Sequence, residues 1–243
     1  MKRVFLATVL LFAFTAALLQ AQEKGTLSSY RIFAKSGKDA DLKKAIAAHA
    51  AKYHTGNWKW RVFSVLSGSD EGAYQINEGP NSWTELEGRK DLSDEHTRDY
   101  ENTVLPLVEK TLPHAYLTYQ RQFSTDSASG PFKKAMLRHF YLKPGKGQRF
   151  ANSMATLKKV WEKLGMKMTV WSSYYSGPPR VVVAYRLPNG FIDLEKSRAK
   201  EVREAFDELE GNGAYVRFLE DLDQCVERLD EEIIELMPDL SSK

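Results

Sequence analysis

The sequence contains very little cysteine: Cys225 is the single one among 243 residues. A chain with one cysteine cannot form an internal disulfide, so packing has to stabilise its fold. Cys225 lies on the apolar side of a helical pattern that runs from Leu222 to Leu229. We interpret it as a buried, inert thiol. A reactive or intermolecular thiol is the alternative.

The sequence also lacks the short motifs of common catalytic and cofactor sites. It has no HExxH, no CxxC, no GxGxxG after a strand, no GxxxxGK(S/T) and no GxSxG elbow. His49 and His54 are five residues apart, which turns their rings away from a common helix face. His96, His114 and His139 show no metal-ligand spacing either. We therefore predict no metal site and no resident cofactor.

Charge of one sign is not in excess. The chain has 35 Lys and Arg against 32 Asp and Glu, a formal net charge of +3 at pH 7. A chain this close to neutral gives no reason to expect nucleic acid as a partner.

A long apolar run stands at the N-terminus, from Val4 to Leu19, directly after Lys2 and Arg3. This run is shorter than the roughly 20 residues that span a bilayer, and Ala21 supplies a small residue for cleavage. We predict a signal peptide over residues 1–21 and export to the periplasm or outside the cell. No stable membrane anchor would then remain. An uncleaved anchor is the alternative.

An internal repeat covers most of the remaining chain. Gly37-Lys38, Pro80-Asn81 and Leu86-Glu87 recur 108 residues later as Gly145-Lys146, Pro188-Asn189 and Leu194-Glu195. A repeat of this length marks a duplicated structural unit. In each copy, apolar periodicity predicts the order strand, helix, strand, strand, broken helix, strand. In the first copy the broken helix spans residues 84–112, with the break at Pro106.

This order is that of the split βαβ unit, and the doubled unit resembles the dimeric α/β-barrel superfamily in its single-chain, tandem form. The resemblance implies an α+β fold of two tandem βαββαβ ferredoxin-like units, whose antiparallel four-stranded sheets pack face to face as an intramolecular pseudo-dimer. The predicted units span residues 28–124 and 135–241, joined by a linker over residues 125–134. Whether the chain oligomerises further is left open.

His49 is the leading candidate for a functional residue. Its spacing from Leu42, Ile46 and Tyr53 places it on the inward face of the first helix, while the matching residue of the second copy is Leu157. A histidine there can act as a catalytic base, a haem ligand or a hydrogen-bond donor to a ligand. A half-buried histidine with a structural partner is the alternative.

Further candidates for ligand binding are Arg31 and Arg138, at corresponding places on the first strands, and the aromatic residues Trp60 and Tyr116. An arginine in the cleft would hold a carboxylate or phenolate, and aromatic rings would line a pocket for a planar ligand. Rim arginines and core-filling rings are the alternatives.

Two functions follow. The first is an exported protein that binds a small apolar or aromatic ligand in the cleft of the first copy, or serves as a scaffold. The second, implied by the resemblance, is a cofactor-free monooxygenase-like or haem-using enzyme with His49 as the working residue. A fold alone does not choose between them.

Overall fold

The computed structural model describes residues 24–90, 92–128, 130, 132–195 and 197–243. The predicted signal peptide lies outside these residues. No helix in the described part of the chain is both long enough and apolar enough to cross a membrane.

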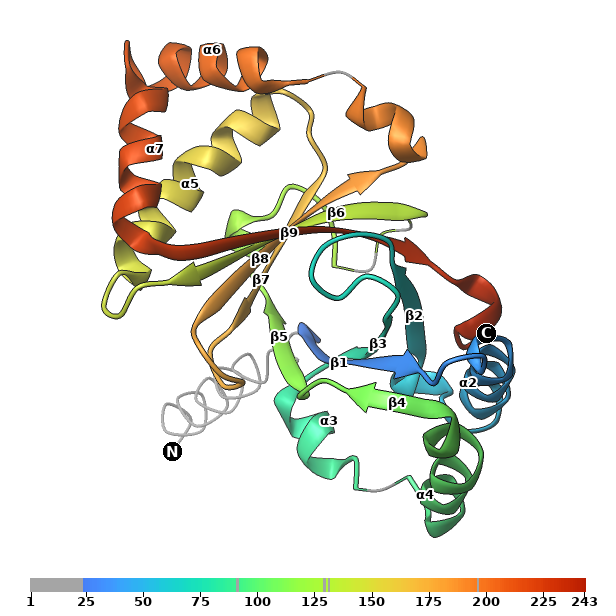
Figure 1. Ribbon diagram of the computed structural model, residues 1–243. Helices are drawn as coiled ribbons and strands as arrows, with labels where there is room; N and C mark the ends of the chain where they lie inside the picture. Colours follow the sequence, from blue (N-terminus) through green and yellow to red (C-terminus); the bar gives the residue numbers. More distant parts are fainter. Residues whose placement is uncertain (1–23, 91, 129, 131, 196) are drawn as a thin grey trace, which may run out of the picture.

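A closed antiparallel barrel forms the centre of the molecule (Figure 1). Eight strands of the described chain follow one another around it in the order β3-β2-β9-β6-β8-β7-β5-β1, and the pairing of β1 with β3 closes the ring. Their bounds are β1 Thr26–Ala34, β2 Trp60–Val65, β3 Tyr74–Asn81, β5 Ala115–Tyr119, β6 Lys134–Leu142, β7 Met168–Ser173, β8 Arg180–Leu187 and β9 Val226–Leu236. The predicted α+β class is confirmed.

Two seams join the strands of residues 24–128, the first half, to those of residues 132–243, the second half. Strand β9 pairs with β2 and with β6, and strand β5 pairs with β1 and with β7. The last strand of each half therefore hydrogen-bonds to the other half. Because both edges of the sheet are paired, the strands form a closed barrel with a filled interior. The sequence predicts two sheets packed face to face and does not predict this closure.

Helices cover the outside of the barrel. Helix α2 (Asp39–Tyr53) buries Leu42, Ile46 and Ala50 against the outer face of the first half. Helix α5 (Gly147–Lys163) does the same on the second half, where α6 (Ala199–Glu210) and α7 (Ala214–Cys225) pack on it. Cys225 is fully buried beneath α5, as predicted.

The segment predicted as one broken helix is more irregular. It contains α3 (Trp83–Gly88), α4 (Asp94–Asp99), a π-helical turn over Tyr100–Val104 and a 3₁₀ turn over Leu105–Leu107. Pro106 lies in that last turn, so the predicted break is confirmed. The chain then continues as strand β4 (Val108–Thr111), which pairs with β1, where a helix was predicted.

Candidate metal centre

Three of the five histidines meet between α2 and the outer face of the barrel. One ring nitrogen each from His49, His54 and His96 lies within 4.8 Å of the other two. His49 and His54 come from the C-terminal end of α2, and His96 comes from α4. We call these three residues the histidine cluster.

The end of helix α2 brings the first two rings together. The helix stops at Tyr53, and His54 leaves it with φ −98° and ψ 76°, while its N–H still donates to the carbonyl of Ala50 at 3.1 Å. The His54 ring turns back to stack on Trp60, with centroids 3.7 Å apart, and comes within 5.2 Å of the His49 ring. The five-residue spacing therefore does not separate them.

A capped short helix supplies the third ring. The Ser93 hydroxyl accepts from the backbone N–H of His96 at 3.1 Å and so starts α4. The Tyr53 hydroxyl donates to the carbonyl of Glu95 at 3.3 Å, which fixes α4 against α2. The π-helical turn that follows carries Tyr100, whose ring meets the His49 ring edge-on at 5.3 Å.

Hydrogen bonds assign the proton position in two of the rings. His49 Nδ1 lies 2.7 Å from Asp99 Oδ2, and His54 Nδ1 lies 3.0 Å from Glu78 Oε2 and 3.1 Å from the Trp58 carbonyl. Carboxylate and carbonyl oxygens only accept, so Nδ1 is the protonated nitrogen in both rings. Nε2 of each neutral ring therefore carries a lone pair, as in carboxylate–histidine–metal arrangements.

The buried lone pairs have few partners. His49 Nε2 is buried and finds no hydrogen-bond partner among the described residues. His54 Nε2 accepts a hydrogen bond from His96 Nε2 at 3.3 Å, and an ion between the two rings would take the place of that proton. Two nitrogens bound to one tetrahedral zinc ion are about 3.3–3.4 Å apart, given Zn–N bonds of about 2.0–2.1 Å. The other separations, up to 4.8 Å, would shorten as the rings close on an ion.

Burial favours the neutral form of both oriented rings. Desolvation is the largest influence on His49 and lowers its pKa, while the hydrogen bond to Asp99 acts in the opposite direction. Burial is likewise the largest influence on His54 and lowers its pKa, while Glu78 acts in the opposite direction. Because the neutral imidazole is the form that binds metal, the environment keeps these two residues ready to act as ligands.

Only some of the predicted site residues belong to this cluster. His49 is one of its three members, and Trp60 lies beside it, with its ring 5.3 Å from that of His49. Arg31 instead points into the barrel, where it binds Glu232, Asp70 and Gln75.

The other two predicted residues lie at the surface. Tyr116 packs on exposed Trp83, and Arg138 forms an exposed ion pair with Glu231.

Sequence reasoning missed His54, His96 and their neighbours Asp99 and Glu78. The prediction of no metal site considers only the spacing of histidines along the sequence, and three candidate ligands converge here from two separate helices. The signal available in the sequence was the presence of three histidines between residues 49 and 96.

Haem does not fit this arrangement. The His49 side chain has no exposed surface, and the rings of Tyr53, His54, Trp60, His96 and Tyr100 surround it at centroid distances of 4.9–5.3 Å. A porphyrin needs a flat space in front of the coordinating nitrogen, and these rings fill that space.

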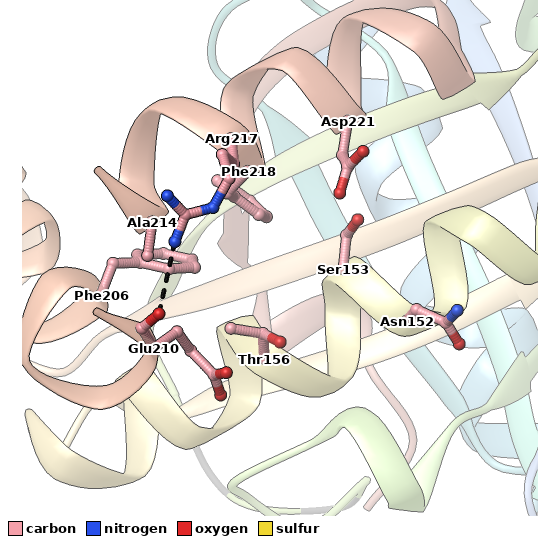
Figure 2. Close-up of a pocket in the computed structure, with 9 residues that line it drawn as sticks. All are labelled: Asn152, Ser153, Thr156, Phe206, Glu210, Ala214, Arg217, Phe218 and Asp221. Atoms are coloured by element: carbon pink, nitrogen blue, oxygen red, sulfur yellow. Dashed lines mark hydrogen bonds between the residues drawn. The ribbon is translucent and has the colours of Figure 1, made fainter. Parts of the chain in front are cut away.

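Two surface hollows of the described chain lie away from the cluster. One, of about 360 Å³, opens between α5, α6 and α7, where Phe206 and Phe218 form the apolar part and Ser153, Arg217 and Asp221 the polar part (Figure 2). Arg217 donates there to the carbonyl of Glu210 at 3.3 Å. The other hollow, which Asp126 helps to line, also contains none of the residues predicted for ligand binding.

No protein-family model matches the sequence, and no curated protein matches it significantly. Solved structures do resemble the fold. A provisionally named monooxygenase from Fusobacterium nucleatum subsp. nucleatum has a TM-score of 0.57 at 12% identity, over 87% of this chain and 91% of that chain. A mutant chlorite dismutase from Candidatus Nitrospira defluvii has a TM-score of 0.54 at 8% identity, over 89% and 93%.

An anthrone oxidase-like protein has a TM-score of 0.53 at 11% identity, over 89% of this chain and 93% of that chain. The likeness extends over nearly the whole length of each of these chains. At such identities it shows the fold alone.

Proposed function

We propose that this protein binds one divalent transition-metal ion through ring nitrogens of His49, His54 and His96. The observation that carries the proposal is the convergence of three ring nitrogens within 4.8 Å, one of them a buried Nε2 with no partner among the described residues. Zinc is the ion that the donor set fits best, because three neutral imidazoles and one open position are a common tetrahedral zinc arrangement.

A purely structural role for the three rings explains the geometry less well. Leaving a buried lone pair without a partner costs about 1–3 kcal/mol, and His49 Nε2 is in that position. Two of the rings are also oriented by buried or half-buried carboxylates, which a packing role does not require. Both features are what a metal site needs: a buried lone pair in front, as at His49, and fixed ring orientation behind.

The test is direct. We expect the EDTA-treated protein to take up one equivalent of zinc per chain in equilibrium dialysis. His49→Ala, His54→Ala and His96→Ala should each weaken zinc binding by at least 100-fold, because each removes one of three ligands. His114→Ala is the matched control, since His114 lies outside the cluster against Tyr30. Equal zinc uptake by all four variants would disprove the proposal.

We further propose that the two halves are tandem ferredoxin-like units over residues 28–124 and 135–241, joined by residues 125–134. The strand order supports this, since β5-β1-β3-β2 in the first half and β9-β6-β8-β7 in the second follow the same scheme. The metal site belongs to the first unit alone. Residues 108 positions after the three histidines are Leu157, Glu162 and Glu204.

A second candidate function is an enzyme of the oxygenase kind. Its specific support is that neighbours of the same fold include a provisionally named monooxygenase and chlorite dismutase. An ion held by three protein ligands keeps a position open for a reactant, as an enzyme requires. Because haem does not fit at His49, addition of haemin should produce no Soret shift, and a shift would favour the haem-using form instead.

An apolar or aromatic ligand beside His49 has less support. Such a ligand would have to displace Tyr53, Trp60 or Tyr100, whose rings already lie against the imidazole.

We also propose export to the periplasm or the exterior, which the sequence of residues 1–21 supports.

A further inference from the structure

The charges around the histidine cluster leave a bound ion uncompensated. The Glu78 carboxylate behind His54 is held by Arg89, with Nε 2.6 Å from Oε1 and Nη2 2.9 Å from Oε2. The Asp99 carboxylate behind His49 lies 3.9 Å from Lys52 Nζ. Each carboxylate therefore has its own cation, and neither is left free to neutralise an ion held by the three rings.

These are also the charged groups that act on the two oriented rings. Asp99 and Lys52 influence His49, and Glu78, itself paired with Arg89, influences His54. A divalent ion would therefore add two positive charges to a site surrounded by the rings of Tyr53, Trp60 and Tyr100. A charge in such surroundings is poorly screened and strongly attracts a counter-ion.

Among the described residues, the protein offers no ligand for the fourth coordination position. The candidate group contains the three histidines alone, and the oxygens of Asp99 and Glu78 already accept hydrogen bonds at the far side of the rings. The Tyr53 hydroxyl already donates to the backbone carbonyl of Glu95.

The surrounding rings limit the size of whatever fills this position. Centroids of Tyr53 and His96 lie 5.0 Å and 4.9 Å from that of His49, and Trp60 stacks on His54 at 3.7 Å. Rings at these distances are in contact, so an aromatic molecule is excluded, and only a ligand of a few atoms can be taken up as the rings shift around the ion.

We infer that the loaded centre takes a small monoanion as its fourth ligand, hydroxide in plain buffer and a linear anion of two or three atoms when one is supplied. The inference rests on the proposed metal binding and identifies the reactant class of the site as small anions. The accessible side is that of α4, because His96 is half-buried while His49 and His54 are buried.

Cobalt(II) substitution tests this inference with a visible signal. The cobalt-loaded protein should show the intense d–d bands of a four-coordinate ion, and titration with sodium azide should change them with one azide bound per cobalt. Sodium sulfate at equal ionic strength is the anion control and should leave the bands unchanged, because sulfate is too large for the ring-lined space.

The possible results separate the two proposals. Absence of cobalt bands would overturn metal binding itself. Bands that stay unchanged at saturating azide would overturn the small-anion inference and leave metal binding standing. Bands that respond equally to sulfate would show an open site and also overturn the size argument.

Arg89→Gln tests the charge argument, since it leaves the Glu78 carboxylate uncompensated. We expect azide affinity to fall by roughly tenfold through the added negative charge, with the cobalt bands retained and Arg89→Lys restoring most of the affinity. Arg149→Gln, which breaks an exposed pair with Asp221 on the second half, is the matched control. Equal azide affinity in Arg89→Gln, Arg149→Gln and wild type would refute the charge argument.

Discussion

Glu232 joins the two halves of the barrel through one carboxylate, and its removal gives a quantitative prediction. It lies on β9. Its carboxylate accepts a hydrogen bond from Arg31 Nη1 of β1 at 2.8 Å and lies 2.8 Å from His139 Nε2 of β6. Only 6% of its side chain is exposed. Burial alone would raise the pKa of Glu232, but the hydrogen bonds from His139 and Arg31 lower it to about 2.

The pKa gives the size and direction of the effect. A fall from 4.5 to about 2 corresponds to about 3 kcal/mol of stabilisation of the folded state. Because the folded-state pKa is the lower one, this stabilisation is present above pH 4.5 and disappears as the pH falls through about 2. Glu232→Gln should therefore lower the free energy of unfolding by about 3 kcal/mol at pH 7 and have little effect near pH 2.

Urea denaturation of the wild type and Glu232→Gln at pH 7, 5, 4, 3 and 2.5 measures this difference at constant ionic strength. Glu231→Gln is the matched control: its side chain is 48% exposed, so its ion pair with Arg138 contributes at most about 1 kcal/mol. A difference between wild type and Glu232→Gln that stays constant from pH 7 to pH 2.5 would refute the linkage argument.

Three further predictions concern the cluster, alkaline stability and the core. Asp99→Asn should weaken zinc binding by about 10–100-fold in dialysis, because it removes the carboxylate that orients His49; unchanged affinity would contradict this role. Burial raises the pKa of Tyr74 to about 12, so its contribution to stability is present below pH 10 and is lost as the pH rises through about 12. Urea midpoints should accordingly fall less for Tyr74→Phe than for wild type between pH 9 and 11.5, and parallel curves would argue against it. Ile46→Ala should lower the free energy of unfolding by about 2–5 kcal/mol, since Ile46 is fully buried under α2; a loss below 1 kcal/mol would show that the core relaxes into the space.

The fold was largely predictable from the sequence because alternating strands and the 108-residue repeat are local or periodic signals. The faces of the strands were harder to predict. Tyr30 meets Trp60 on the helix-covered face, and the next residue, Arg31, faces the barrel interior. Both faces are buried in a covered barrel, so alternation alone could not decide which of them Arg31 joins.

Strand β4 shows a different limit. Residues 108–111 follow a helical pattern in the sequence, yet they pair with Ile32, Phe33 and Ala34 of β1 as an added edge strand. The pairing partner lies more than 70 residues away in the chain, so the tertiary contact overrides the local preference.

The histidine cluster was beyond sequence reasoning for a related reason. Its formation depends on the non-helical exit of His54 and on the Ser93 cap that positions His96. Neither feature produces a ligand motif, because the two ligand groups are 42 residues apart and belong to different helices. His49 was nevertheless identified, since its place on the buried face of α2 follows from helical periodicity.

The two halves fill the space outside their sheets by different means. In the second half, Leu157, which stands where His49 stands in the first, packs toward Phe206 and the apolar faces of α6 and α7. In the first half, the short helix α4 offers no buried residue at all, and histidines with aromatic rings take the place of an apolar layer. Under the proposed function, the bound ion attaches α4 to the rest of the protein, whereas apolar packing attaches α6 and α7.

Metal removal should therefore loosen the segment from Trp83 to Val104 before it affects the barrel. Hydrogen exchange of the zinc-loaded and EDTA-treated protein measures this difference. Equal protection of that segment in both states would contradict the idea that the ion holds α4 in place.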